Sequence, residues 1–463
     1  MSMMIPHWPI YTGPNKDFEN SVLRTKTILS RLENPHLKMK NIIHITGTKG
    51  KGSTALYISN ILRASGYNVN TYISPHIYEC NERILLNGNK VVDEDLYLAT
   101  EAVRIVCEEK YKNAERIEPS LFESLTCSAF LLMSKNNADF NVIEVGMGGK
   151  NDATNVFDDN PPLVCVFTPI HLDHIKFLGN HVEDVALNKS FLIKCGTKYV
   201  IMSSQSKEVR GVISNVAKQC NVNDGNIISY GEEYEVFKDE DSGKPFYDSD
   251  RFDTYFPFAK PNMQGDYQLI NAGCAISTCL AVEECGFEKK MSMDAINDGI
   301  KQTINIVRME KITRGRLFNT LPTGSIFYVD GAHNQLASHA LASYIKDFSE
   351  EVKKNNQQYK ICVAIARTKN ADNEAFLNEF YDKNGNFLVD LIICTRANLE
   401  SIPEPPERIA KVCDGMNIKY LIAYTIDEVL QRVVDFANGE KVLLICTGSL
   451  YIARDVHLAN QIQ

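Results

Sequence analysis

Short apolar runs alternate with amphipathic stretches along most of the chain. Five runs have the length and composition of buried strands, and they cover residues 42–45, 69–73, 140–145, 163–168 and 199–202. Apolar residues recur at helical spacing in the segments 55–64, 93–112, 120–135, 268–284 and 293–306. Strands that alternate with helices predict a mostly parallel sheet that is covered on both faces. Residues 226–258 are polar, aromatic and short in period, so they predict a small antiparallel insert.

The same alternation begins again in the last third of the chain. Strands are predicted at residues 326–330, 360–366, 388–395, 418–424 and 442–446, with helices between them. A chain of 463 residues is too long for one ordinary core, so at least two domains are expected. We therefore predict an α/β fold with two domains, at residues 1–311 and 312–463, and no low-complexity linker between them.

A glycine-rich segment, GTKGKGST at residues 47–54, separates the first of these strands from the helix predicted at 55–64. Glycine lets backbone N–H groups approach a phosphate, a helix N-terminus favours negative charge, and Lys51 can reach the β- and γ-phosphates. Because Gly52 follows Lys51, the segment departs from the usual GxxxxGK[ST] pattern, and a structural turn is the alternative. The candidate phosphate-binding residues are Gly47, Thr48, Gly50, Lys51, Gly52, Ser53 and Thr54.

Polar residues follow several of the predicted strands, at the edge where open parallel sheets bind their ligands. Ser74 follows the second strand, Glu144 lies near the end of the third, and residues 168–174 follow the fourth. A carboxylate in an apolar strand is costly unless it is paired or metal-bound. Glu144 is therefore either hydrogen-bonded locally or, as we favour, a ligand of Mg²⁺. His174 alone is typical of a structural histidine, but beside a nucleotide and Glu144 we favour a ligand role.

Three further positions bear on the site. Lys189 lies in an otherwise apolar helix, and by itself it is typical of a lysine that snorkels to solvent. The segment DGAHN at 330–334 is either a turn in which Asn334 caps a helix or a polar cluster that faces the nucleotide. Arg316, near the domain boundary, is placed like a charge that acts in trans on phosphate.

Composition limits the partners that we expect. The net charge of −9 argues against a nucleic-acid scaffold, which usually presents a basic surface. No apolar run approaches the roughly 20 residues that span a bilayer, and the N-terminal residues lack the basic and apolar regions of a signal peptide. We therefore expect a cytoplasmic protein without a membrane partner. The residues alone predict an enzyme that uses Mg²⁺ and a nucleotide, and they leave its second substrate open.

Taken together, the motifs resemble those of folylpolyglutamate synthases and dihydrofolate synthases, in the Mur ligase superfamily. The likeness runs from about residue 17 to residue 455 and implies a P-loop NTPase-like ATP-binding domain followed by a Rossmann-like C-terminal glutamate-ligase domain. Other Mur ligases share only the first motif and scattered pieces. Besides residues 47–54, the motifs are SPH at 74–76, NERI at 81–84, EVGMGGKNDATN at 144–155, LDH at 172–174, QLIN at 268–271, GRL at 315–317, DGAHN at 330–334 and TGSLY at 447–451.

The resemblance implies ATP-dependent amide bond formation. A substrate carboxylate attacks the γ-phosphate of ATP and becomes an acyl phosphate, and the amine of L-glutamate then displaces phosphate. The implied substrates are ATP, L-glutamate, dihydropteroate and reduced folates. The sequence does not separate the two synthase activities, and we expect a bifunctional, monomeric enzyme that uses two Mg²⁺ ions.

The resemblance also assigns roles to individual residues. It implies that Lys189 is carbamylated, which would turn a cation into an anion able to hold a second Mg²⁺ and would reverse the snorkelling interpretation. The implied metal ligands are Ser74, Glu144, His174 and Lys189, and the implied catalytic residues are Lys51, Lys189, His174 and Arg316. Further nucleotide contacts are implied for Asn271, Arg316, Asp330 and His333, and substrate contacts for Asn81, Arg83, Phe122, Asp152 and Thr154.

The chain departs from the family pattern at four positions without losing a catalytic group. Lys49 stands where asparagine is usual, and Lys150 stands where arginine is usual. Tyr267 replaces a usual histidine, and Thr313 replaces a usual tryptophan. One rival function is that of a Mur-type cell-wall ligase, which the SPH and DGAHN motifs and the lack of a separate UDP-binding domain disfavour. The other is a P-loop ATPase or binding module, which would need neither Lys189 nor the polar cluster at 330–334.

Overall fold

The chain folds into two units, each with its own sheet. The computed structural model describes residue 8 and residues 17–76, 79–108, 115–173, 175–263, 265–304, 309–398 and 403–461. The first unit comprises Met1–Asn262 and Asp266–Ile304, and the second comprises Met263–Gly265 and Asn305–Gln463. We predicted a boundary near residue 311.

Eight strands of the first unit share one sheet. They are β1 (Ile42–Thr46), β2 (Val69–Tyr72), β3 (Ile84–Leu86), β4 (Asn89–Lys90), β5 (Phe140–Glu144), β6 (Val164–Phe167), β7 (Tyr199–Met202) and β8 (Ile227–Ser229). Their order is β4-β3-β2-β5-β1-β6-β7-β8, and only β3 and β4 run antiparallel to their neighbours. The predicted mostly parallel sheet is confirmed. The antiparallel edge was not predicted, because strands of two or three residues carry no readable period.

The strand order places β1 at a topological switch point. The strands that follow it in the chain lie on one side, as β5 and β2, and the later strands β6 to β8 lie on the other. In register, Ile45 pairs with Glu144 of β5, and Thr46 pairs with Phe167 of β6. The loops that follow these three strands therefore leave the sheet side by side, which is where open α/β sheets bind ligands.

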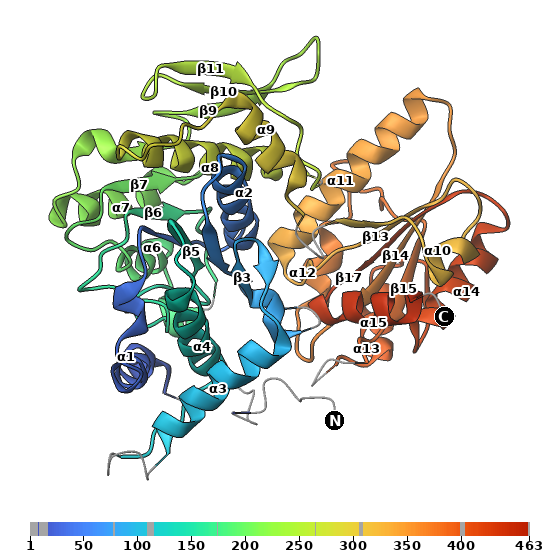
Figure 1. Ribbon diagram of the computed structural model, residues 1–463. Coiled ribbons are helices and arrows are strands. Elements are labelled where there is room, and N and C mark those ends of the chain that lie inside the picture. Colours follow the sequence, from blue (N-terminus) through green and yellow to red (C-terminus); the bar gives the residue numbers. More distant parts are fainter. Residues whose placement is uncertain are drawn as a thin grey trace. The chain divides into compact units, whose positions relative to one another are not determined.

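Helices cover both faces of this sheet (Figure 1). Helix α2 packs on β2 and β5 and lies beside α8 and α9, whereas α1, α3 and α4 enclose Tyr72 and Ile143 on the opposite face. Helices α6 and α7 continue that second layer over Cys165 and Phe167. The helices are α1 (Ser21–Arg31), α2 (Lys51–Ala64), α3 (Asp93–Cys107), α4 (Leu121–Lys135), α5 (Ile175–Leu178), α6 (Val182–Ser190), α7 (Lys207–Gln219), α8 (Tyr267–Glu284) and α9 (Met293–Gln302).

The predicted antiparallel insert is also present. Strands β9 (Glu235–Lys238), β10 (Pro245–Ser249) and β11 (Thr254–Pro257) form a three-stranded antiparallel sheet in the order β11-β10-β9. Tyr247 on its buried face donates or accepts a hydrogen bond with Ser277 of α8 at 2.8 Å. Strand β8, at the start of the predicted segment, instead completes the large sheet.

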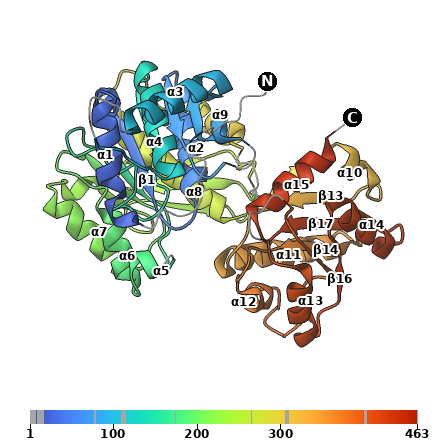
Figure 2. The same ribbon diagram turned by 90° about the horizontal axis from the view of Figure 1, so that it is seen from below.

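The second unit is a six-stranded sheet between two helical layers (Figure 2). Helices α11, α12 and α13 lie on one face, and α14 and α15 lie on the other. The order β12-β13-β17-β14-β15-β16 includes the five predicted strands, all parallel, and an unpredicted antiparallel edge strand, β12. The elements are β12 (Glu310–Ile312), α10 (Arg316–Thr320), β13 (Ile326–Val329), α11 (Gln335–Lys354), β14 (Lys360–Ala366), α12 (Asn373–Asn378), β15 (Leu391–Thr395), α13 (Pro406–Gly415), β16 (Tyr420–Ile422), α14 (Ile426–Ala437), β17 (Val442–Thr447) and α15 (Leu450–Asn460).

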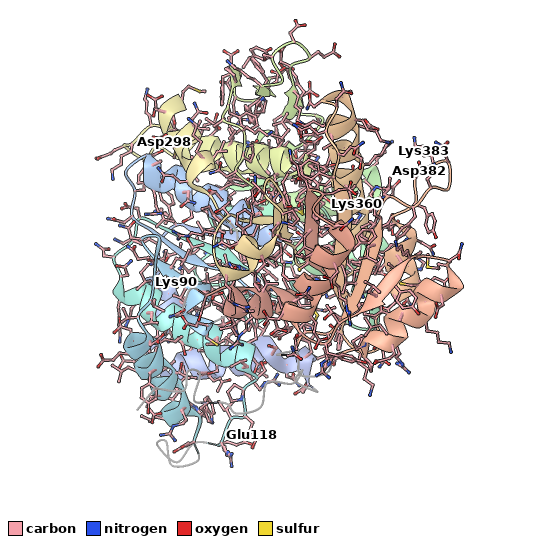
Figure 3. All side chains as sticks on the ribbon, turned by 90° about the vertical axis from the view of Figure 1, so that its right-hand side faces the viewer. Lys90, Glu118, Asp298, Lys360, Asp382 and Lys383 are labelled. Atoms are coloured by element: carbon pink, nitrogen blue, oxygen red, sulfur yellow. The ribbon has the colours of Figure 1, made fainter. Side chains whose placement is uncertain are left out.

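Charged side chains cover the outside of both units (Figure 3). Lys90, Glu118 and Asp298 are exposed in the first unit, and Lys383 is exposed in the second. None of the helices that the structure describes is long and apolar enough to cross a lipid bilayer.

Close packing of α9 on α2 gives a direct test of this fold. A Cβ atom on Gly299 would lie 2.6 Å from the Cα and N atoms of Ile61, so Gly299→Ala should lower the free energy of unfolding by about 1–3 kcal/mol. Gly211→Ala is the matched control, because a Cβ there meets nothing within 4 Å and alanine favours the helix by about 0.5–1 kcal/mol. Urea denaturation measures the free energy of unfolding of both variants. Equal effects of the two substitutions would contradict the close packing of α9 on α2.

Candidate active site

The glycine-rich segment forms a strand–turn–helix unit, as its sequence predicts. Strand β1 ends at Thr46, and α2 begins at Lys51. Gly50 lies between them with φ of +83°, a left-handed conformation that glycine adopts without steric cost, and its carbonyl accepts a hydrogen bond from the N–H of Thr54 at 2.8 Å. The N-terminus of α2 therefore points its free backbone N–H groups at the end of the central strand, as an anion site requires.

Two lysine side chains meet at one carbonyl of this loop. The Nζ atom of Lys51 lies 3.3 Å from the Gly47 oxygen, and the Nζ atom of Lys189 lies 2.9 Å from the same oxygen. Lys189 is 3% exposed, so the interpretation of it as a snorkelling residue is wrong. Burial, together with the nearby Lys51 ammonium, lowers the pKa of Lys189 to about 7. Helix α6 thus delivers a buried amine into the phosphate loop.

The strand ends beside the loop place Ser74 and Glu144 together. The backbone N–H of Ser74 donates to Glu144 Oε2 at 2.8 Å, and the Glu144 side chain is buried. A buried carboxylate at the end of a parallel strand, beside a phosphate loop, is an oxygen ligand that suits Mg²⁺. Among the described residues, no three His, Cys, Asp or Glu side chains form a metal-binding group, and His174 lies outside those residues. The ligand roles of Ser74, Glu144, His174 and Lys189 stay predictions.

Neighbouring elements hold the loop on both sides. The N–H of Thr48 donates to the Pro169 carbonyl at 2.9 Å, and the Thr48 hydroxyl donates to the His171 carbonyl at 3.1 Å. On the other side, a Cβ atom on Gly50 would lie 2.6 Å from Asn271 Oδ1 of α8. The structure therefore brings Asn271, a predicted nucleotide contact, against the loop.

The predicted substrate residues Arg83 and Phe122 form a second group of contacts. The Nε–H of Arg83 donates to His76 Nδ1 at 2.8 Å, and the Arg83 guanidinium carbon lies 6.0 Å from the centre of the Phe122 ring. Phe122 also stacks on Tyr72, with ring centres 6.2 Å apart. Asn81, predicted to act with Arg83, donates from Nδ2 to Asp93 Oδ1 at 2.8 Å.

Asp152 and Thr154 lie behind the turn that follows β5. A Cβ atom on Gly146 would lie 2.5 Å from Phe122 Cζ and 3.1 Å from Asp152 Oδ2, so the ring and the carboxylate meet at this glycine. Oδ2 of Asp152 accepts a hydrogen bond from the Met147 N–H at 2.9 Å. Burial raises the pKa of Asp152, although its hydrogen bonds from Thr154 and Met147 oppose that rise.

Comparison with known proteins places the chain in a family. The family model for the Mur ligase middle domain matches residues 45–279, which contain the phosphate loop, Glu144, Lys189 and Asn271. This protein belongs to the Mur ligase family. Within that family it is similar to the dihydrofolate synthetase of Saccharomyces cerevisiae, at 27% identity over 96% of this chain and 99% of the relative.

Two further comparisons agree with this placement. The folylpolyglutamate synthase of Lacticaseibacillus casei is 30% identical over 71% of this Mur ligase and 73% of the relative. A solved folylpolyglutamate synthase in complex with AMPPCP is 25% identical, with a TM-score of 0.76 over 94% of this chain and 96% of that one. The resemblance drawn from the motifs is confirmed.

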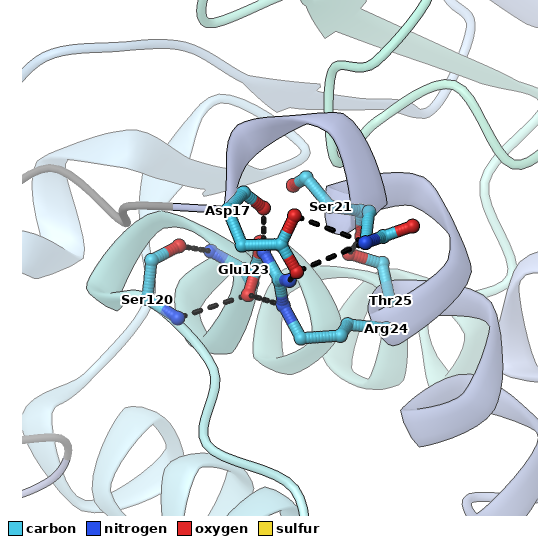
Figure 4. Close-up of polar contacts among 7 residues, drawn as sticks. Asp17, Ser21, Arg24, Thr25, Ser120 and Glu123 are labelled. Atoms are coloured by element: carbon cyan, nitrogen blue, oxygen red, sulfur yellow. Dashed lines mark hydrogen bonds and ion pairs between the residues drawn. The ribbon is translucent and has the colours of Figure 1, made fainter.

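A partly buried ion pair anchors the helix of this Mur ligase that carries Phe122 (Figure 4). Arg24 of α1 donates to both Glu123 oxygens, from Nη2 at 2.7 Å and from Nε at 3.2 Å. Glu123 Oε2 also accepts the N–H of Ser120, whose hydroxyl accepts the Glu123 N–H. This capping box starts α4 and fixes its first turn, to which Phe122 belongs. The Ser-x-x-Glu spacing at 120–123 was a readable signal, but its partner Arg24 was not.

The second unit of the Mur ligase holds its predicted residues in local contacts. Asn334 caps α11 by accepting from the Ala337 N–H at 3.0 Å, so the capping interpretation is confirmed. Asp330 accepts backbone N–H groups from Met309 and Ala332. His333 Nδ1 lies 2.8 Å from the Gly331 carbonyl. Arg316 is exposed and forms an ion pair with Asp427 at 2.6 Å. Nucleotide contacts by Arg316, Asp330 and His333 stay predictions.

Proposed function

We propose that this Mur ligase uses ATP to form an amide bond between L-glutamate and the carboxylate of dihydropteroate, of a reduced folate, or of both. The observation that carries the proposal is the meeting of the Lys51 and Lys189 side-chain nitrogens at the Gly47 carbonyl of the phosphate loop. A yeast dihydrofolate synthetase that matches nearly the whole chain, and a folylpolyglutamate synthase that binds an ATP analogue, support the choice of substrates.

The chemistry proceeds in two displacements. An oxygen of the substrate carboxylate attacks the γ-phosphorus of ATP, ADP leaves, and an acyl phosphate forms. The neutral amine of L-glutamate then attacks the acyl carbon, phosphate leaves with the bridging oxygen, and the amine loses a proton as the amide forms. Both steps move negative charge across the phosphate groups, so they depend on fixed positive charge and backbone donors at the loop.

The residues of the loop supply that environment. Lys51 begins α2 and can turn from the Gly47 carbonyl to the phosphates, where its charge adds to that of the helix N-terminus. Arg316 of the second unit is exposed, and its guanidinium is available to exchange Asp427 for phosphate. We also assign nucleotide contacts to Asn271, Asp330 and His333, because these residues match positions of the family motifs that contact the nucleotide.

The first unit also offers a place for divalent cations. Ser74, Glu144 and His174 would hold one Mg²⁺, and carbamylated Lys189 would help to hold a second. Bound there, Mg²⁺ would neutralise phosphate charge during the transfer. The buried Glu144 carboxylate fits this role, because it is an oxygen ligand at a strand end beside the phosphate loop.

Lys189 has the properties that carbamylation requires. Its nitrogen must be neutral to attack the carbon of CO₂, and a pKa of about 7 leaves much of it neutral near physiological pH. The attack of the neutral amine forms an N–C bond and releases one proton, so the buried amine becomes an anionic carbamate. Lys51 lies close enough to lower the pKa of Lys189, and its charge would favour the anionic carbamate.

Arg83, Phe122 and Asp152 form the proposed pterin site. The Phe122 ring supplies a flat apolar surface, and Asp152 supplies a carboxylate at the same turn. Arg83, held by His76 over the Phe122 ring, supplies a cation that suits the carboxylate end of the substrate. We further propose that the enzyme acts as a cytoplasmic monomer.

The assay that tests this function is release of phosphate from ATP. Release should require glutamate and a pterin, and comparison of dihydropteroate with tetrahydrofolate identifies which of the two activities is present. Lys51→Met should lower turnover at least about 10²-fold, the effect of losing one preorganised electrostatic group. Lys49→Met, in the same loop, is the control and should change turnover only a few-fold. Release that needs neither pterin would contradict the ligase function.

Carbamylation is tested by ¹³C NMR with labelled bicarbonate. At pH 8 the protein should give a carbamate signal that is absent from Lys189→Met and present in Lys150→Met, which removes an exposed lysine. Because only the neutral amine reacts, the signal should weaken as the pH falls below about 7. A wild-type protein without the signal, or a signal that persists in Lys189→Met, would refute the modification.

A further inference from the structure

The central strand contains a buried histidine to which no role has yet been given. His44 lies in the middle of β1 with no exposed surface, and its Nε2 atom lies 2.9 Å from Thr154 Oγ1. Its Nδ1 atom has no hydrogen-bond partner within the described part of the chain. The ring packs edge-on against Phe157, with ring centres 5.6 Å apart. A histidine buried this deeply is costly unless its polar atoms are used.

Thr154 connects this histidine to the carboxylate of the proposed pterin site. The Thr154 hydroxyl donates to Asp152 Oδ1 at 2.6 Å, and the Thr154 N–H donates to the same oxygen at 3.0 Å. The other oxygen of Asp152 takes the N–H of Met147 and lies beside Gly146, where the Phe122 ring also reaches. His44, Thr154 and Asp152 therefore form one chain of hydrogen bonds that ends at the pterin site.

The number of available protons determines which group donates and which accepts in each of these hydrogen bonds. Asp152 receives three donors, two backbone N–H groups and one hydroxyl, which suits an ionised carboxylate that only accepts. The Thr154 hydroxyl has a single proton and gives it to Asp152, so its oxygen is left as the acceptor toward His44. His44 must then donate from Nε2–H, and its Nδ1 atom carries a lone pair, which costs less to bury unpaired than an N–H.

We propose that His44 is a positioning residue, whose Nε2–H tautomer orients the Thr154 hydroxyl and so keeps Asp152 an acceptor for the N–H groups of a pterin-like heterocycle. The identity of that ligand rests on the proposed function. Thr154, which is buried without exposed surface, connects His44 to Asp152. Burial lowers the pKa of His44 to about 3, so the ring stays neutral while the enzyme works.

The tautomer is tested on the wild-type protein by NMR. Long-range ¹H–¹⁵N spectra of histidine-labelled protein should place the His44 proton on Nε2 and leave Nδ1 unprotonated, with no change between pH 6 and pH 8. His44→Gln supplies the assignment of the signal. A proton on Nδ1 would reverse the chain of hydrogen bonds and overturn the proposal, whatever the enzyme does with its substrates.

Steady-state kinetics test whether His44 affects the binding of the pterin substrate. His44→Leu removes the donor to the Thr154 hydroxyl and should raise the KM for dihydropteroate about tenfold, the scale of one lost hydrogen bond, while kcat and the KM for ATP change less than about twofold. His44→Gln keeps an N–H donor and should recover most of the loss. His36→Leu is the matched control, because His36 is also buried against Phe157 but has no bond to Thr154.

The outcomes separate the two proposals. An unchanged KM for dihydropteroate in His44→Leu, or equal losses for dihydropteroate and ATP, would overturn the positioning role while the ligase function stood. A wild-type enzyme that neither binds nor uses a pterin would refute the proposed function, and with it the ligand assigned to Asp152. If His44→Leu does not fold, the tautomer measured in the wild-type protein and the behaviour of His44→Gln still decide the question.

Discussion

The arrangement of the first unit depends on the Gly47 carbonyl, which accepts hydrogen bonds from two lysines. This carbonyl can face both lysines because Gly47 lies where β1 leaves the sheet at the switch point, with the ends of β5 and β6 beside it. Lys51 reaches it from the start of α2, and Lys189 reaches it from α6 on the opposite face of the sheet. Burial of Lys189, together with the nearby Lys51 ammonium, lowers the pKa of Lys189, and a neutral amine is what carbamylation needs.

The same strand ends supply the other parts of the site. Glu144 takes the N–H of Ser74 from the neighbouring strand, and the turn after β5 brings Asp152 and Phe122 to Gly146. The Arg24–Glu123 ion pair fixes the helix that carries Phe122, and His44 fixes the hydroxyl that holds Asp152. A rigid scaffold of this kind allows a ligase to hold a carboxylate in line with the γ-phosphate.

Residues with a local signature could be predicted from the sequence. Glycines around Lys51 and a charge in the apolar run that ends at Glu144 predicted the phosphate loop and a polar strand end, and the alternation of runs predicted both sheets. Lys189 was misjudged from the residues alone, because a lysine in an apolar helix has the same pattern whether its nitrogen reaches water or a buried carbonyl. His44 was hidden inside an apolar strand, and its partner Thr154 lies 110 positions away in the sequence.

The central claim is that the substrate carboxylate is activated by direct transfer of the γ-phosphoryl group. Dihydropteroate labelled with ¹⁸O in its carboxylate tests this claim, because the bridging oxygen of an acyl phosphate leaves with the phosphate. Mass spectrometry of the products should find one ¹⁸O atom in the inorganic phosphate for each glutamate that is ligated. Unlabelled phosphate, with the departing ¹⁸O atom found in AMP or in water, would contradict the account.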